Sequence, residues 1–149
     1  MNNGKLKITA IAASAIVALA SCELETHDNG KLDGFWHLTQ IDTLTTGGIK
    51  NVSDDKLFWS VQSLLLELSD RSAIDNPKYI FRFSNRSDSL LLYNARLSDR
   101  RQGDPALESV EPLQQYGVNS LDEKFAVEAL TGSKMILKSD TVRLRFTKF

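Results

Sequence analysis

The sequence predicts an all-β domain, an antiparallel meander of about seven to eight short strands that closes into a β-barrel. Runs of alternating apolar and polar residues recur between turn signals, and they end in a meander at the C-terminus. We predict no long helix between these runs. Each strand has one apolar face to bury, and closing the sheet on itself buries all of these faces and removes the exposed edges.

The first predicted strand covers residues 34–42, with Trp36, Leu38 and Gln40 on one face. Residues 45–48 then break the pattern. Residues 57–69 are ambiguous, because their leucines fall at helical spacing but also fit alternation with a change of face near Gln62. We favour a strand, since its neighbours are strands; the change of face would need a bulge or burial on both sides.

The second half of the chain gives clearer signals. Residues 79–94 predict a hairpin, and a long polar stretch follows at 98–111. Pro112 and Gly117 bracket a single helical turn, and the spacing of Ser120 and Glu123 is that of a capping box at a second short turn. Three alternating runs complete the meander, at 125–129, 135–137 and 142–146.

The N-terminus has the pattern of a secretion signal, which we assign to residues 1–21. Lys5 and Lys7 precede an uncharged run that is shorter than the roughly 20 residues a membrane-spanning helix needs. The sequence Leu-Ala-Ser-Cys at 19–22 resembles the lipobox of bacterial lipoproteins. That resemblance implies cleavage before Cys22 and lipidation of its thiol, and so a membrane-anchored outer-membrane lipoprotein of the cell envelope, periplasmic or surface-exposed.

Residues 22–33 are predicted to be a flexible acidic tether below a domain at 34–149. The chain has 18 basic and 19 acidic residues and a formal net charge of −1, without a basic stripe. This balance argues against nucleic acid as a partner.

Gly34-Phe35-Trp36 resembles the GxW signature of lipocalins, the calycin-type barrels. The segments 125–127, 135–137 and 144–149 resemble the closing strands of small lipocalin-like lipoproteins of gut Gram-negative bacteria, a family of mostly unassigned activity. The resemblance implies that Trp36 lies at the closed base of the barrel beneath a basic side chain of the last strand, Arg143 or Arg145.

Six aromatic residues are candidates to line a cavity for a small hydrophobic ligand, although core packing explains the same residues. They are Trp36, Trp59, Phe81, Phe83, Phe125 and Phe146. The alternative is a non-catalytic interaction module that docks an envelope or host protein through the barrel surface or the 98–111 loop. Within that loop, Arg100 and Arg101 either contact an anionic partner or are simply solvated.

We expect no enzyme activity, no metal site and no cofactor. The two histidines, His27 and His37, are far apart in the sequence, and Cys22 is the only thiol. Asp54 and Asp55 are adjacent, so on a strand they would face opposite ways rather than form an acid–base pair.

Three short motifs resemble the Asp-Ser/Thr-aliphatic O-glycosylation motif of some gut bacteria. Their acceptor residues would be Thr43, Ser89 and Thr141, all at or near predicted turns.

Overall fold

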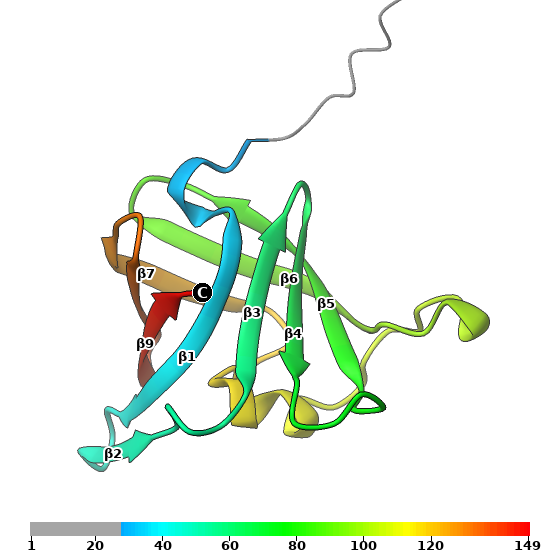
Figure 1. Ribbon diagram of the computed structural model, residues 1–149, viewed down its shortest axis with the longest axis horizontal. Helices are drawn as coiled ribbons and strands as arrows, with labels where there is room; N and C mark the ends of the chain where they lie inside the picture. Colours follow the sequence, from blue (N-terminus) through cyan, green and yellow to red (C-terminus); the bar gives the residue numbers. More distant parts are fainter. Residues whose placement is uncertain (1–27) are drawn as a thin grey trace, which may run out of the picture.

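The structure, a computed structural model, describes residues 28–149 (Figure 1). The signal segment, Cys22 and His27 lie outside these residues. In chain order the elements are η1 (Gly30–Leu32), β1 (Gly34–Thr43), β2 (Gly48–Asn51), β3 (Leu57–Gln62), β4 (Leu65–Asp70), β5 (Lys78–Asn85), β6 (Ser89–Leu97), η2 (Arg100–Gln102), η3 (Glu111–Tyr116), β7 (Glu123–Leu130), β8 (Lys134–Lys138) and β9 (Val142–Lys148). None of the helical segments between residues 28 and 149 has the length and hydropathy of a membrane span.

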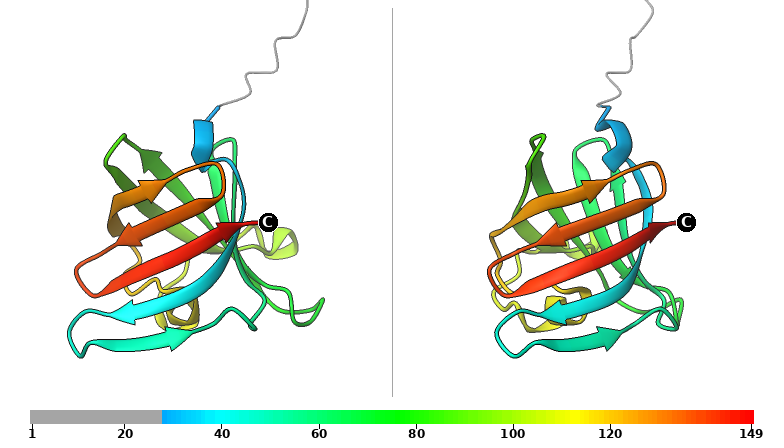
Figure 2. Two further views of the ribbon diagram at one scale, coloured as in Figure 1. Left: turned by 60° about the vertical axis from the view of Figure 1, so that its left-hand side comes forward. Right: turned by 90° about the vertical axis from the view of Figure 1, so that its left-hand side faces the viewer.

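Eight of the strands form a closed antiparallel barrel, which confirms the predicted meander. Each strand from β3 to β9 pairs with the next, and β1 joins the two ends by pairing with both β3 and β9. Figure 2 shows this closure, with β1 and β9 running side by side along the barrel wall. The short strand β2 is additional; it forms a hairpin with the second half of β1, where only a turn was expected.

The ambiguous segment 57–69 is a hairpin, not one strand with a bulge. Gln62 pairs with Leu65, and the two residues between them form the turn. Ser63 has φ 53°, a left-handed conformation that such tight turns require. The apparent change of face near Gln62 is therefore a reversal of the chain, which alternation alone cannot distinguish from a bulge.

The predicted inward face of β1 is correct for its first half and wrong for Gln40. Trp36 and Leu38 are fully buried, but the pairing with β9 slips between Leu38 and Gln40. The extra residue of this bulge rotates the rest of the strand, so that Ile41 faces the core in place of Gln40.

The folded domain begins before Gly34, so the prediction of a flexible tether through residue 33 is wrong for residues 28–33. Leu32 in η1 is 1% exposed and belongs to the barrel core. Asp33 accepts hydrogen bonds from the backbone and side chain of Asn29, at 2.9 and 2.6 Å. The Asn29 amide also donates to the carbonyl of Ser63 at 2.9 Å, which fixes the start of the domain beside the β3–β4 turn.

Candidate functional site

The interior of the barrel is filled by side chains. Of the six aromatic candidates, Trp36, Trp59, Phe81 and Phe125 have no exposed area, and Phe146 is 2% exposed. The Trp59 ring lies edge-on to Phe125 and Phe146, at centroid distances of 5.7 and 5.0 Å. Phe83 is only partly buried at the margin of the same core. The five buried rings therefore belong to the packed core of the barrel, and three of them, Trp59, Phe125 and Phe146, contact one another through Trp59.

The end of the barrel near η1 is closed over Trp36. The indole Nε1 donates to the carbonyl of Leu32 at 2.8 Å, and the Lys148 Nζ lies 4.8 Å from the indole centroid. The same Nζ donates to the carbonyl of Lys31 at 3.2 Å. Gly34 leaves room for this lysine, because a Cβ at that position would lie 2.7 Å from the Lys148 Cε. The cation above Trp36 thus also ties η1 to the last strand.

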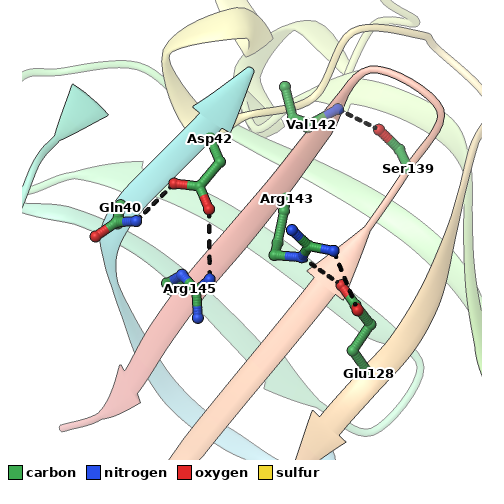
Figure 3. A network of polar contacts seen from close by, with 7 residues as sticks. All are labelled: Gln40, Asp42, Glu128, Ser139, Val142, Arg143 and Arg145. Atoms are coloured by element: carbon green, nitrogen blue, oxygen red, sulfur yellow. Dashed lines mark hydrogen bonds and ion pairs between the residues drawn. The ribbon is translucent and has the colours of Figure 1, made fainter. Parts of the chain in front are cut away.

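The expectation that Arg143 or Arg145 covers Trp36 is wrong. Along β9, Val142, Leu144 and Phe146 face the core, so the two arginines face outward. Arg143 donates to Glu128, with the closer contact at 2.6 Å, and Arg145 lies 3.5 Å from Asp42 (Figure 3). The hydrogen bond from Arg143 holds the pKa of Glu128 below its ordinary value.

Lys148 was the correct residue, and its position in the alternation could have identified it. Residues 144, 146 and 148 share one parity along the strand, and Lys148 is paired directly with Trp36. It was overlooked because a lysine does not belong to an inward apolar pattern, although at the end of a barrel its stem can pack while its charge reaches solvent.

The opposite end of the barrel is closed by η3 (Figure 1). Pro112 and Gly117 bracket this element as predicted, and Gly117 ends it in the left-handed conformation with φ 82°. Its inward side chains are fully buried in the barrel core: Leu113, Tyr116 and, just beyond it, Val118. We refer to these three residues as the plug; sequence reasoning missed their role because their apolar spacing lies inside a polar region.

The plug is held by few polar contacts. The Trp59 Nε1 donates to the carbonyl of Tyr116 at 3.2 Å, and the Tyr116 ring lies edge-on to Tyr79 at 6.3 Å. The Tyr116 hydroxyl is buried near Asp70 without a well-formed hydrogen bond to residues 28–149. Its burial, aided by the negative charge of Asp70, raises the pKa of Tyr116 above its ordinary value.

Glu123 anchors the chain that follows the plug. Its carboxylate accepts hydrogen bonds from the backbone N–H of Asn119 and of Ser120, the latter at 3.0 Å. This is half of the predicted capping box, formed in a turn that leads into β7. Burial of the carboxyl raises the pKa of Glu123 above its ordinary value.

A second aromatic cluster lies on the outside of the barrel, and it includes His37, the only histidine among the described residues. The Phe58 ring stacks on Phe35 at 4.4 Å and on His37 at 4.9 Å, and Phe149 packs edge-on to both phenyl rings. The His37 Nε2 lies 2.8 Å from the carbonyl of Asp55. The contacts of His37 are therefore those of a packed strand residue.

The structure also places the remaining candidates. Asp54 and Asp55 lie in the turn before β3, and no group of three metal-binding side chains gathers among residues 28–149. Of the proposed glycosylation acceptors, Thr43 ends β1, Ser89 begins β6 and Thr141 is exposed in the β8–β9 turn. Glycosylation of these residues stays a prediction.

An eight-stranded meander barrel with Gly-x-Trp at its closed base defines the class of lipocalin-like proteins. The family model described as lipocalin-like domain matches residues 17–149, and this chain belongs to that family.

Two solved structures share the fold. One is a lipocalin-like protein from Bacteroides uniformis ATCC 8492, with TM-score 0.60 and 20% identity, covering 80% of this chain and 100% of the other. The second is an uncharacterized protein from Bacteroides eggerthii DSM 20697, with TM-score 0.53 and 20% identity, covering 78% of this chain and 98% of the other. Comparison with curated proteins finds no match.

Proposed function

We propose that the chain is a membrane-anchored, non-catalytic binding protein of the cell envelope, which takes a small hydrophobic ligand into the barrel end that η3 closes. One observation carries this proposal: the plug fills that end with apolar side chains from a segment outside the barrel wall. An apolar ligand could replace the plug without breaking a strand pair.

The energetics of the plug support an exchange of this kind. A six-residue 3₁₀ segment has little stability of its own, so its position depends on burial of Leu113, Tyr116 and Val118. A ligand that buries a similar apolar area would compensate for their release at about 25 cal/mol per Å². Displacement would also return the Tyr116 hydroxyl to water, which relieves the cost of burying it unpaired.

The anchor is proposed from the lipobox-like sequence at Cys22. Only five residues, 23–27, lie between Cys22 and the first described residue, Asp28, so the link between the lipid and the barrel is short in sequence. In cells of a lipoprotein-processing bacterium, the wild-type chain is expected to sediment with membranes and to enter the detergent phase. The Cys22→Ser variant should lose both properties, and a variant that remains in the detergent phase would contradict lipidation at Cys22.

The ligand proposal predicts that weakening the plug strengthens binding. The mature chain carrying Cys22→Ser would be titrated with the neutral probe N-phenylnaphthylamine, with binding followed by the increase in probe fluorescence. We expect saturable binding to the starting chain. We expect Leu113→Ala to bind about tenfold more tightly, because a loss of about 1.4 kcal/mol in the free energy that holds the plug in place lowers the dissociation constant of a competing ligand about tenfold.

The matched control is Phe58→Leu. This substitution trims a buried side chain on the outside of the barrel and leaves the interior unchanged. Its affinity should equal that of the starting chain. Absence of saturable binding to the starting chain, or equal affinities for all three proteins, would contradict binding at the plugged end.

A second candidate, docking of an envelope or host protein, is favoured by the form of the 98–111 region. Leu97 donates to the carbonyl of Pro105 at 3.0 Å, and Leu107 donates to that of Ala95 at 3.0 Å, so the chain leaves and rejoins the barrel at one place. The residues between, 98–104, form an arm that carries η2 at its tip and stands away from the barrel (Figure 1).

A further inference from the structure

A groove runs along the outside of the barrel between β4, β5 and the arm of residues 98–104. It consists of two adjoining hollows of about 790 and 340 Å³, which share Leu65, Ile80 and Arg82 in their lining. Arg100 lines the larger hollow, and Arg96 lines the smaller one. We call the combined feature the arginine groove.

Sheet pairing brings these side chains to one surface. Arg82 is paired with Leu65 across one neighbouring strand, and Ile80 is paired with Arg96 across the other. Leu66 and Phe81 face the core, so their neighbours along β4 and β5 face outward. The arm leaves the barrel at the edge of this surface, where its base is held by the bridge between residues 96 and 106 and where Arg100, Gly103 and Asp104 join the lining.

The groove concentrates positive charge that lacks an ionic partner. Arg82, Arg96 and Arg100 form no ion pair with any residue between 28 and 149. Glu67 also lines the larger hollow, but Lys78 lies 3.9 Å from its carboxylate. Because the chain as a whole carries a formal charge of −1, this cluster is a local feature and does not reflect a generally basic surface.

A buried acceptor without a donor lies in the same groove. Asp104 lines the smaller hollow and is partly buried, and its Oδ1 has almost no exposed area and no hydrogen bond from residues 28–149. The Arg96 guanidinium donates elsewhere, to the backbone carbonyl of Asp104 at 3.0 Å and to the Asn94 side chain at 3.1 Å. An unpaired buried carboxylate oxygen is costly, so a ligand that supplies a hydroxyl here would be favoured.

The backbone around this hollow is left-handed at two positions. Asn94 and Asp104 have φ values of 56° and 49°, a region that Asn and Asp adopt more readily than other non-glycine residues. Asn94 belongs to a bulge, since the pairing of β5 with β6 shifts by one residue between Ile80 and Arg82.

The groove becomes apolar toward the β3–β4 turn. Leu64 and Leu65 line the larger hollow and are 46% and 41% exposed. The adjacent Ser63 accepts the hydrogen bond from Asn29, so this apolar end lies where the chain enters from its proposed lipid anchor. The groove thus has an apolar end beside the N-terminal segment and a cationic end beside the arm.

We propose that the arginine groove binds an anionic amphiphile with one acyl chain, a phosphate and a free hydroxyl, as in the head group of a glycerophosphate lipid. The phosphate contacts Arg82, Arg96 and Arg100, whose guanidinium groups match phosphate geometry. The hydroxyl donates to Asp104 Oδ1, and the acyl chain covers Leu64 and Leu65. This site lies outside the barrel and does not rest on the proposed ligand at the plugged end.

The test uses the mature chain with Cys22→Ser and dodecanoyl lysophosphatidylglycerol below its critical micelle concentration. Heteronuclear NMR should show saturable amide shifts at residues 65, 80, 82, 96 and 104. The zwitterionic choline analogue with the same chain should bind at least about tenfold more weakly, since it lacks the net charge that the arginines recognise. Glycerophosphate without a chain should shift the arginine end alone, which separates the head group from the whole lipid.

Arg100→Gln and Arg101→Gln form a matched pair on the arm. Both arginines are exposed in η2, but only Arg100 lines the groove. We expect Arg100→Gln to weaken binding about tenfold, the loss of one charge-assisted contact, while Arg101→Gln retains the original affinity. Equal effects of the two variants, equal affinity for the choline analogue, or shifts confined to the plug would overturn the proposal.

Discussion

Replacement of Trp59 by alanine is expected to lower the free energy of unfolding by about 3–5 kcal/mol, the range for removing a large buried aromatic side chain. The Trp59 ring is fully buried and packs edge-on against Phe125 and Phe146. Its Nε1 also supplies the hydrogen bond to the carbonyl of Tyr116. The substitution therefore leaves a cavity, removes two aromatic contacts and releases the plug.

Urea unfolding followed by far-ultraviolet circular dichroism measures this loss. Phe149→Ala is a suitable control, because Phe149 is 86% exposed and its ring lies outside the barrel. Its effect should stay within about 1 kcal/mol, the size of an aromatic pair contact at the surface. A loss below about 1 kcal/mol for Trp59→Ala would show that the barrel interior is not packed around this ring.

Alternation was sufficient to predict the inward aromatic residues because each strand buries one face. It placed Trp36 inside correctly, and it found the hairpin at 79–94 and the C-terminal meander. The same rule failed at Gln40, where a bulge inserts one residue. It also failed at residues 63–64, because this two-residue turn contains a leucine and is flanked by apolar residues, so the sequence pattern does not show that the chain reverses there.

The two candidate sites, the plugged barrel end and the arginine groove, are formed by residues far apart in the sequence, so no local sequence pattern predicts them. The plug is a short segment from a polar region. Its three apolar residues can be recognised as core residues only once the barrel is known to end beside them. One strand reversal separates Arg82 from Arg96, and Arg100 follows in the arm; sheet register and the course of the arm place all three along one groove. Register is set by the whole sheet, which a single strand cannot reveal.

Gly117→Ala is expected to destabilise the domain by about 2–5 kcal/mol, as the sum of two costs. Gly117 has φ 82°, where a Cβ costs roughly 1–2 kcal/mol. The added Cβ would also collide with the side chain of Leu144, which is fully buried in the barrel wall. Overpacking of a core adds about 1–3 kcal/mol. We expect the plug, rather than the paired strand β9, to shift in response to the collision.

Gly47→Ala separates these two costs. Gly47 has φ 71°, and no atom lies within 4 Å of the position that a Cβ would occupy. This variant should show the backbone cost alone, so the difference between the two glycine variants, measured by urea unfolding, is the cost of the collision. Equal losses would mean that η3 does not press against Leu144.

Leu144→Ala in the Gly117→Ala background tests the collision directly. On its own, Leu144→Ala should cost about 2–5 kcal/mol as a buried leucine. If the added methyl group fills part of the space that Leu144 vacates, the double variant will be less destabilised than the sum of the single variants, by about 1–3 kcal/mol of coupling. Additive losses would contradict direct contact, whereas strong coupling would establish that the plug and the barrel wall share one packed interior.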